Sequence, residues 1–214
     1  MDCVDNLQFQ SIILKKDQSN NVKRYYFIKR NFDIVISLMG LVLLSPIILF
    51  FSVLVYIESP GKVIFKQKRI GKNGSVFTLY KIRSMRLDAE RNGEQWTQEK
   101  DTRILKIGTF IRRTKIDELP QLINVIKGEM TLVGPRPETP TLTFKFNDKY
   151  PGFVNRLSVT PGLTGLAQIS GGYDLNPHEK LKKDLEYIGN QSLIMDIWIV
   201  INTFLVVITG KGAR

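Results

Sequence analysis

The feature that most constrains this chain is a run of 24 residues without a charged side chain, from Ile34 to Ile57. About 20 such residues suffice to cross the hydrocarbon core of a bilayer as a helix. A cleaved signal peptide would have a shorter apolar region, and a core helix of a soluble protein rarely stays uncharged on all its faces. The run therefore predicts a helix that is retained and inserted in a membrane.

The pair Ser45-Pro46 lies near the middle of this run. A proline removes one backbone hydrogen bond and its ring presses on the carbonyl one turn earlier, so the helix should bend between Val42 and Pro46. The Ser45 hydroxyl could satisfy the carbonyl that is freed there. The bend alone does not decide the topology, because transmembrane helices also tolerate proline.

The basic residues that flank the run are nearly balanced. Six lie within 20 residues on its N-terminal side and five on its C-terminal side. A simple spanning helix should gather its basic residues on the cytoplasmic side. Balanced flanks favour a re-entrant hairpin, with both ends held at the anionic cytoplasmic surface, over the alternative of a kinked single span.

The composition narrows the chemistry. With 214 residues the chain is long enough for one main domain. Its single cysteine, Cys3, and single histidine, His178, disfavour a disulfide framework, a Cys/His zinc site and a Ser-His-Asp catalytic set. Any chemistry must therefore rest on carboxylates, lysines, arginines, hydroxyls or a metal held by oxygen.

The positive charge is concentrated. The chain has 31 basic and 20 acidic residues, a net charge of +11, and 15 of the basic against 5 of the acidic residues lie between Lys62 and Lys115. No RNA-recognition pattern of aromatic residues and no helix-turn-helix accompanies them. This surface predicts phosphates at a membrane as its partners, anionic lipid included, and not nucleic acid.

The rest of the pattern predicts an α+β fold that is mainly helical. Two β-type runs around Gly71 to Ser75 predict a β-hairpin, and Lys81 and Arg83 should share one face of its second strand. An amphipathic helix should end at Gly189, and the apolar run from Leu193 to Thr209 predicts a helix in the membrane interface or packed on the first membrane element. We expect an N-terminal arm over 1–22, the re-entrant helix over 23–60 and a catalytic domain on the cytoplasmic face over 61–214.

Two adjacent carboxylates, Asp117 and Glu118, follow a basic cluster at the start of a predicted helix that should end at Gly128. Asp as an N-cap, Glu in the first turn and Pro120 near the start are common devices for starting a helix, so capping and chemistry remain equally open. The apolar stripe that should face the core consists of Leu119, Leu122, Ile123 and Ile126.

Arg136 stands between Pro135 and Pro137. Its backbone should be confined to an extended form, so that the guanidinium is aimed rather than free. A fixed arginine suits a phosphate, which it can bind with two parallel hydrogen bonds. The chain lacks the glycine-rich phosphate loops, so a nucleotide would have to be held by this basic surface.

Six stretches carry a resemblance to a known family: Ser45-Pro46, Gln67 to Gly71, Tyr80 to Met85, Asp117 to Leu122, Val133 to Pro137, and Pro161 to Gln168. Together, and in this order, they resemble the bacterial sugar transferases, the monotopic polyprenyl-phosphate hexose-1-phosphate transferases that begin glycan assembly. The resemblance covers roughly Lys23 to the C-terminus. Several linked motifs are far more specific than any one of them.

The resemblance implies that a UDP-sugar donates its sugar-1-phosphate to a polyprenyl phosphate, with release of UMP and with Mg²⁺ required. It implies that Asp117 is the nucleophile on the β-phosphorus and forms an aspartyl phosphosugar. Glu118 would help to bind the metal or to activate the polyprenyl phosphate, so both carboxylates are candidate metal ligands, and Arg136 would hold the phosphates. It also implies a helix that re-enters the bacterial inner membrane from the cytoplasmic face and breaks at Ser45-Pro46.

Further phosphate contacts are expected from basic residues whose alternative role is solubility or attraction to anionic lipid. These are Arg83 and Arg112, followed by Lys81 and Arg69. Pro135 and Pro137 are included in the predicted substrate-binding set because they flank Arg136. A rival interpretation is a non-catalytic, basic, membrane-anchored module that binds anionic lipid or nucleic acid, in which Asp117 and Glu118 only cap a helix. The sequence leaves open the donor sugar and the oligomeric state, a homodimer included.

Overall fold

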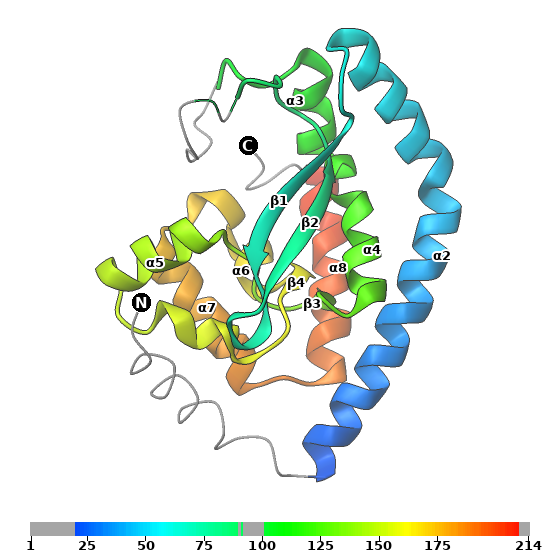
Figure 1. Ribbon diagram of the computed structural model, residues 1–214. Helices are drawn as coiled ribbons and strands as arrows, with labels where there is room; N and C mark the ends of the chain where they lie inside the picture. The colour runs from blue at the N-terminus through cyan, green and yellow to red at the C-terminus, as the bar shows by residue number, and fades with distance from the viewer. Residues whose placement is uncertain (1–19, 90, 92–100, 210–214) are drawn as a thin grey trace.

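The computed structural model describes residues 20–89, 91 and 101–209, so the predicted N-terminal arm lies almost wholly outside the described residues. The described chain is mainly helical, with one antiparallel hairpin and one short parallel pair of strands (Figure 1). This agrees with the predicted fold class. A long helix runs along one side of the molecule, and the remaining elements pack together against it.

The predicted membrane segment forms one helix, α2 (Asn20–Glu58), with Pro46 inside it. A hairpin of two arms is therefore not confirmed; Figure 1 shows α2 as a single bowed helix. The Ser45 hydroxyl donates to the Val42 carbonyl at 2.8 Å, which is the carbonyl that Pro46 cannot bind. This hydrogen bond was expected, and because it satisfies the freed carbonyl, the helix continues beyond Pro46.

Most of the apolar surface of α2 is exposed. The helix is long and apolar enough to cross a membrane, and only 6% of its most apolar stretch is buried. A core helix of a soluble protein would be mostly buried, so this surface needs another apolar environment. Among the exposed residues are Val42, Leu43 and Leu49, each about 70% exposed.

Both ends of α2 contact the same folded body. Near its start, Arg30 donates to the Ile126 carbonyl at 2.7 Å. Near its end, Val55 is fully buried in a cluster with Ile82 and other core residues, and Glu58 accepts hydrogen bonds from the first N–H groups of α3 (Lys106–Arg113). The middle of the helix is thus held between two fixed points on one domain.

The predicted β-hairpin is confirmed. Strands β1 (Ile64–Ile70) and β2 (Val76–Ile82) pair antiparallel, with Ile64 opposite Ile82 and Ile70 opposite Val76. Asn73 in the turn adopts a left-handed conformation, which asparagine tolerates better than most residues. Phe77 and Leu79 point inward and pack on Val125 and Met130.

The sequence did not predict the second pair of strands. Strand β3 (Thr131–Val133) pairs in parallel with β4 (Gly162–Thr164). The backbones meet so closely that a Cβ atom on Gly162 would lie 2.1 Å from the amide nitrogen of Gly134. Between the strands lie α5 (Pro140–Lys149) and the 3₁₀ helix η3 (Phe153–Ser158), and α6 (Leu166–Ser170) follows them.

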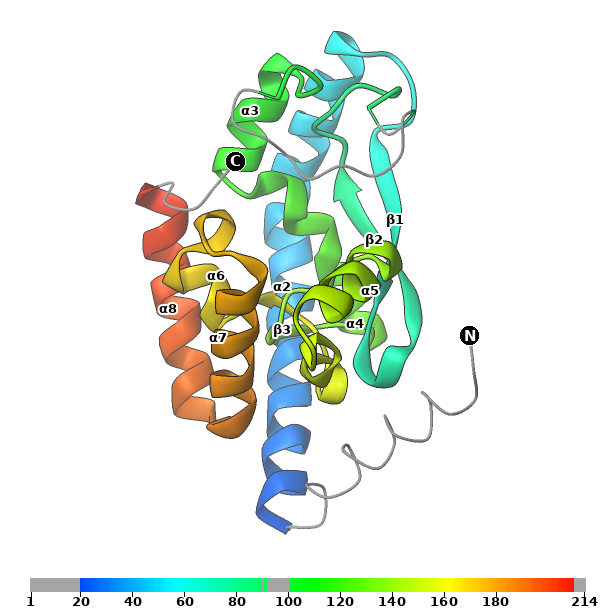
Figure 2. The ribbon, with the colours of Figure 1, turned by 90° about the vertical axis from the view of Figure 1, so that its left-hand side faces the viewer.

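Two C-terminal helices complete the fold as predicted. Helix α7 (Pro177–Gly189) starts with a capping box of Asn176 and Glu179, and α8 spans Leu193–Thr209. In the view of Figure 2 these helices lie on one side of α2 and the β-hairpin on the other. The outer side chains of α8 are exposed and apolar, Ile194 and Phe204 among them, as an interfacial helix requires.

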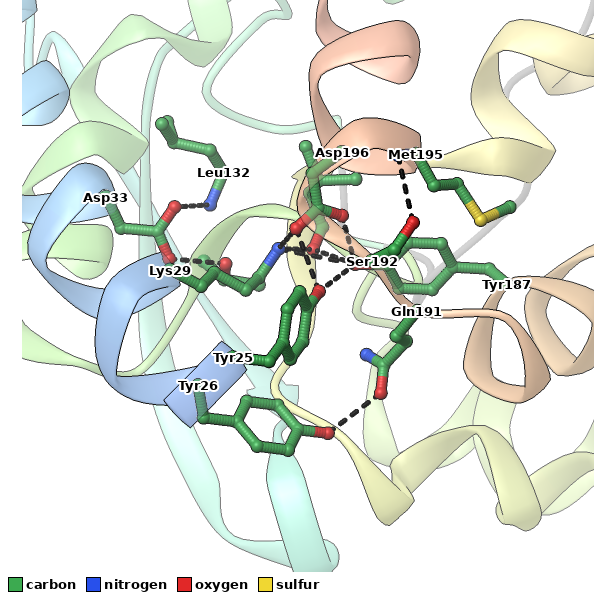
Figure 3. A network of polar contacts seen from close by, with 12 residues as sticks. Tyr25, Tyr26, Lys29, Asp33, Leu132, Tyr187, Gln191, Ser192, Met195 and Asp196 are labelled. Carbon is green, nitrogen blue, oxygen red and sulfur yellow. Dashed lines mark hydrogen bonds and ion pairs between the residues drawn. The ribbon is translucent and has the colours of Figure 1, made fainter. Parts of the chain in front are cut away.

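A buried polar network fixes α8 and α7 to the start of α2 (Figure 3). Lys29 forms an ion pair with Asp196 at 2.6 Å. Asp196 also accepts hydrogen bonds from the hydroxyls of Tyr25 and Tyr187, at 2.8 and 2.7 Å. Lys29 donates to the Val133 carbonyl at 2.9 Å, and the Tyr187 hydroxyl, whose single proton can serve Asp196 or this carbonyl, lies 2.9 Å from the same oxygen. The network therefore also holds the end of β3.

A second contact fixes the start of the same strand. Asp33 accepts hydrogen bonds from the Thr131 hydroxyl and from the Leu132 N–H, the latter at 3.2 Å. Strand β3 is thus attached to α2 at both of its ends. This matters for the site, because the segment that directly follows β3 carries Arg136.

Candidate active site

All seven charged residues predicted from the sequence line one cavity of about 1240 Å³. Its polar part lies between the hairpin, α3 and the segment after β3. Its apolar part is lined by α2 and α8, with Leu44 and Phe204 among the lining residues. The seven are Arg69, Lys81, Arg83, Arg112, Asp117, Glu118 and Arg136. The cavity therefore connects a charged site with the two helices whose outer faces are exposed and apolar.

Asp117 lies inside the 3₁₀ helix η2 (Ile116–Gln121), which precedes α4 (Leu122–Lys127). The alternative that it is an N-cap is wrong: Lys115 takes that position, in a left-handed conformation that turns the chain after α3. A capping aspartate would accept backbone N–H hydrogen bonds. The Asp117 Oδ1 atom is instead buried and has no hydrogen-bond partner among the described residues.

The predicted apolar stripe of this segment is only partly correct. Leu122 is buried, but Ile123 is 39% exposed, and Val125 is the fully buried residue of α4. The reason is the 3₁₀ turn, which advances the chain by three residues per turn and rotates the following helix away from the expected phase. The buried face of α4 also holds Asn124, which donates to the Thr78 carbonyl of β2 at 2.7 Å.

Glu118 is the centre of a charge network. Arg136 binds its carboxylate with two hydrogen bonds, of 2.7 and 3.1 Å, and Lys81 forms a third contact at 3.2 Å. Burial alone would raise the pKa of Glu118, but the charges of Arg136, Lys81 and Lys115 and the hydrogen bonds from Arg136 outweigh it and hold the pKa well below its usual range. Glu118 is therefore ionised at neutral pH.

Asp117 differs from its neighbour, because its pKa is raised. Burial is the main cause of the higher pKa, and the negative charge of Glu118 adds to it. The positive charges of Lys81, Arg112 and Lys115 lower the pKa and only partly offset this effect. Two adjacent carboxylates with pKa values shifted in opposite directions are typical of catalytic sites. The unsatisfied Asp117 carboxylate is thus the group at the site that a cationic or electrophilic ligand would relieve.

The extended segment that carries Arg136 is held along its whole length. Every carbonyl from 135 to 138 accepts a hydrogen bond from another element. Backbone N–H groups bind two of them: that of Gly162 binds the Pro135 carbonyl at 2.9 Å, and that of Ile70 binds the Glu138 carbonyl at 3.0 Å. Side chains bind the other two: Arg156 binds the Arg136 carbonyl at 2.8 Å, and Arg69 binds the Pro137 carbonyl at 3.0 Å. Pro135 and Pro137 are buried. The prediction of an aimed arginine is supported by this geometry.

The other predicted phosphate contacts are also tied into the fold. Arg83 is buried and donates to the Ser59 carbonyl, and Arg112 lies 3.4 Å from the Ser84 hydroxyl. Arg69 forms an ion pair with Glu138 at 3.4 Å in addition to its bond to Pro137. These side chains line the cavity while holding its walls together.

The sequence did not single out Arg156 and Gln168, which also line the cavity. Arg156 is buried and pairs with Asp184 of α7 at 2.7 Å. Neither position belongs to a periodic pattern in the sequence. The only signal for Gln168 was its place in a family motif, and Arg156 had none.

Mg²⁺, which the family resemblance implies, has a limited set of ligands here. Within residues 20–89, 91 and 101–209, no three His, Cys, Asp or Glu side chains gather into a group that could hold a metal. Mg²⁺ is often bound by one or two carboxylates together with substrate phosphates and water. The orphaned Oδ1 of Asp117 fits such a site, whereas both oxygens of Glu118 are engaged by Arg136.

Comparison with known proteins places this geometry in a family. The profile of the bacterial sugar transferases matches residues 24–210. A UDP-N-acetylgalactosamine-undecaprenyl-phosphate N-acetylgalactosaminephosphotransferase of Aeromonas hydrophila is 43% identical over 89% of this chain and 46% of its own length. The exopolysaccharide production protein PSS of Rhizobium leguminosarum bv. phaseoli is 42% identical over 86% of this chain and 98% of its own.

A third relative is the UDP-glucose:undecaprenyl-phosphate glucose-1-phosphate transferase of Escherichia coli (strain K12), 40% identical over 87% of this chain and 41% of its own length. The chain thus spans less than half of the A. hydrophila and E. coli relatives but nearly the whole of the Rhizobium one. The family profile covers most of the chain, including every predicted site residue. This protein belongs to the bacterial sugar transferase family.

Proposed function

We propose that this protein transfers a sugar-1-phosphate from a UDP-sugar to a polyprenyl phosphate, such as undecaprenyl phosphate, and releases UMP. Two observations support this proposal. The relatives from A. hydrophila and E. coli are named for a UDP-sugar donor and an undecaprenyl-phosphate acceptor. The cavity joins a cationic, carboxylate-bearing site to apolar walls on α2 and α8, which suits a polar donor and a lipid acceptor in turn.

The observation that carries the mechanism is the buried, unpartnered Oδ1 of Asp117. In the first step this oxygen forms a bond to the β-phosphorus of the donor, the bond from that phosphorus to the bridging oxygen breaks, and UMP leaves with the electron pair. In the second step an oxygen of the polyprenyl phosphate attacks the same phosphorus and the Asp117 carboxylate is released. A covalent intermediate lets one site serve two dissimilar substrates.

A carboxylate attacks an anionic diphosphate only where the repulsion of their charges is offset. Lys81, Arg112 and Lys115 are the cations that act on Asp117. Arg136 is aimed into the same site and would bind the phosphates through its remaining donor capacity or by exchanging partners with Glu118. Mg²⁺ would supply further neutralisation of charge, with the Asp117 carboxylate as its first candidate ligand. Glu118, the second candidate, could take part only by giving up a hydrogen bond from Arg136.

We place both ends of α2 on the cytoplasmic side of the bacterial inner membrane. Arg30 near the start and Val55 near the end both contact the body that contains the site. Two ends that contact one compact domain favour a position on the same side of the bilayer, with the apolar middle of α2 immersed in one leaflet. The reaction would then begin the assembly of an exopolysaccharide, a capsule or another glycan.

The direct test is turnover. The purified protein is incubated with a panel of UDP-sugars, undecaprenyl phosphate and Mg²⁺, and UMP is measured. We expect UMP from at least one donor, none from Asp117→Asn, and unchanged release from Asp148→Asn, in which an exposed aspartate of α5 is altered. Mass spectrometry of the wild type with donor alone should find the added phosphosugar on Asp117.

Two results would contradict the proposal. Undiminished activity of Asp117→Asn would show that Asp117 is not the nucleophile. No UMP from a broad panel, with protein that binds vesicles of anionic lipid, would favour the rival interpretation of a basic membrane-anchored module.

A further inference from the structure

Arg156 and Asp184 form the most deeply buried ion pair of the described chain. Their side chains are 3% and 1% exposed, and Arg156 Nη2 lies 2.7 Å from Asp184 Oδ2. Removing two charges from water carries a large desolvation penalty, and well-packed apolar residues often hold two elements together equally well. Stability alone therefore does not explain why the pair is there.

The same nitrogen of Arg156 has a second partner. Nη2 donates to the carbonyl oxygen of Arg136 at 2.8 Å. A single atom thus joins α7, through Asp184, to the backbone of the residue whose guanidinium binds Glu118. The contact series from Asp184 through Arg156 and Arg136 to Glu118 is continuous, and each link is 2.8 Å or shorter.

The Arg136 carbonyl needs such a partner. The residue lies in an extended segment outside any strand, and prolines on both sides provide no N–H group for pairing there. The carbonyls of Pro135 and Glu138 are held by backbone N–H groups, whereas those of Arg136 and Pro137 are held by the side chains of Arg156 and Arg69. That side chain is itself oriented by Asp184 and by the ring of Phe153, whose centroid lies 4.8 Å from the guanidinium carbon.

We propose that Arg156, oriented by Asp184, is a positioning residue for phosphate binding: it fixes the backbone of Arg136 and so aims the Arg136 guanidinium at Glu118 and at the substrate phosphates. This inference rests on the proposed function in that it assigns Arg136 to the phosphates. The ionised form of Asp184 is needed to orient Arg156. Burial raises the pKa of Asp184 to about 6, and the nearby charge of Glu138 adds to the shift, whereas Arg156 and Lys180 oppose it.

The first test is a double-mutant cycle on UMP release. Asp184→Asn and Arg156→Lys should each lower kcat/KM by about tenfold, because the aimed guanidinium shifts while the chemistry remains. In the Arg136→Ala background the same changes should have almost no further effect. If Asp184→Asn and Arg156→Lys lower kcat/KM by the same factor with and without Arg136, the pair acts independently of Arg136. That result would overturn the inference.

The matched control is Glu186→Gln. It also converts an acid to an amide in an ion pair of α7, with Lys183 at 2.8 Å, but that pair is exposed and does not contact Arg136. Activity should stay unchanged in this variant. If Asp184→Asn lowers the yield of folded protein, Arg156→Lys serves as the second variant, because lysine keeps the positive charge and a hydrogen-bond donor. Thermal unfolding shows which variants remain folded.

A second readout does not depend on turnover. Hydrogen–deuterium exchange of the peptide that contains Gly134 to Glu138 should become faster in Asp184→Asn and remain unchanged in Glu186→Gln. Unchanged exchange in Asp184→Asn would overturn the positioning role even if the wild type turns over UDP-sugars. Faster exchange in a protein that releases no UMP would support the positioning role while the proposed function fails.

Discussion

The guanidinium of Arg136 binds both carboxylate oxygens of Glu118, at 2.7 and 3.1 Å, across 18 residues of sequence. The pair lines the cavity, and Lys81 contacts the same carboxylate. A phosphate that enters the cavity therefore meets an arginine that is already oriented and a carboxylate that is already neutralised. If the arginine moved away, the buried Glu118 carboxylate would keep only the charges of Lys81 and Lys115.

Arg136→Lys tests whether the two-pronged geometry matters beyond the charge. Lysine keeps the charge but cannot make two parallel hydrogen bonds, so kcat/KM for UMP release should fall by about tenfold to a hundredfold. Arg113→Lys is the control, because Arg113 is exposed on α3 and does not line the cavity. Equal activity of both variants would show that a point charge suffices at position 136.

Asp117→Asn should stabilise the protein while it abolishes activity. At neutral pH the wild type keeps a buried carboxylate without a partner for Oδ1, and removal of such a functional group typically adds about 1 kcal/mol to the free energy of unfolding. Because the pKa of Asp117 is raised in the folded protein, its ionisation lowers stability as pH rises through that pKa. The gain of the variant should therefore shrink as the pH falls toward 3.8, the ordinary pKa of an aspartate, and vanish below it, where Asp117 is protonated in both states.

Thermal unfolding of the detergent-solubilised protein between pH 4 and pH 8 measures this difference. A variant that is less stable than the wild type at pH 7 would show that Asp117 has a structural partner. Asp148→Asn, on the surface of α5, should show no pH-dependent difference from the wild type.

Lys29→Met should strongly destabilise the fold. It leaves Asp196 buried against two tyrosine hydroxyls without a cation, and breaking a buried ion pair in this way costs about 3–5 kcal/mol. Thermal unfolding in detergent gives the shift, with Lys23→Met, an exposed lysine of the same helix, as control. The double variant Lys29→Met/Asp196→Leu should recover part of the loss, and a double variant as unstable as the single one would argue against charge as the cause.

Gly162→Ala should separate β3 from β4. Its Cβ would lie 2.1 Å from the Gly134 amide nitrogen, a distance that real Cβ atoms do not reach, so the strands must move apart. We expect a loss of about 2 kcal/mol in stability and of most of the activity, because β3, the strand that β4 would push away, leads into the Arg136 segment. Gly189→Ala, where a Cβ meets nothing within 4 Å, should leave both unchanged. A stable, active Gly162→Ala would show that the strands can separate without moving Arg136.

Cysteine labelling tests the topology of α2. Lys23 and Lys62 are exposed and flank the helix core. In a Cys3→Ser background, Lys23→Cys and Lys62→Cys should both react with a membrane-impermeant maleimide in inside-out vesicles and neither in intact spheroplasts. A kinked single span would instead label one position from each side.

The local elements of this fold were readable from the sequence. The hairpin follows from two β-type runs around Asn73-Gly74, and α8 follows from an apolar run between Ser192 and Gly210. Such signals lie within a few residues of one another. The cavity-lining carboxylates and Arg136 were found because they stand in a helix start and in a proline frame.

Contacts that span the chain were not readable. Lys29 and Asp196 are separated by 167 positions, and a lysine before an apolar run is indistinguishable in sequence from an ordinary flanking charge. The β3–β4 pair joins strands of three residues each, which are too short to show alternation. The 3₁₀ turn at Asp117 was not predicted for a related reason. A segment of six residues is too short for its hydrophobic pattern to distinguish a 3₁₀ helix, with three residues per turn, from an α-helix, with 3.6.

The four held carbonyls from Pro135 to Glu138 have one more consequence. Because the backbone there is fixed before any ligand arrives, binding of a phosphate by Arg136 would require little ordering of this segment and little loss of its conformational entropy. In the proposed reaction the nucleotide donor and the lipid acceptor would use the same stationary anchor one after the other. The change from one half-reaction to the next would then need no movement of the segment from Pro135 to Glu138.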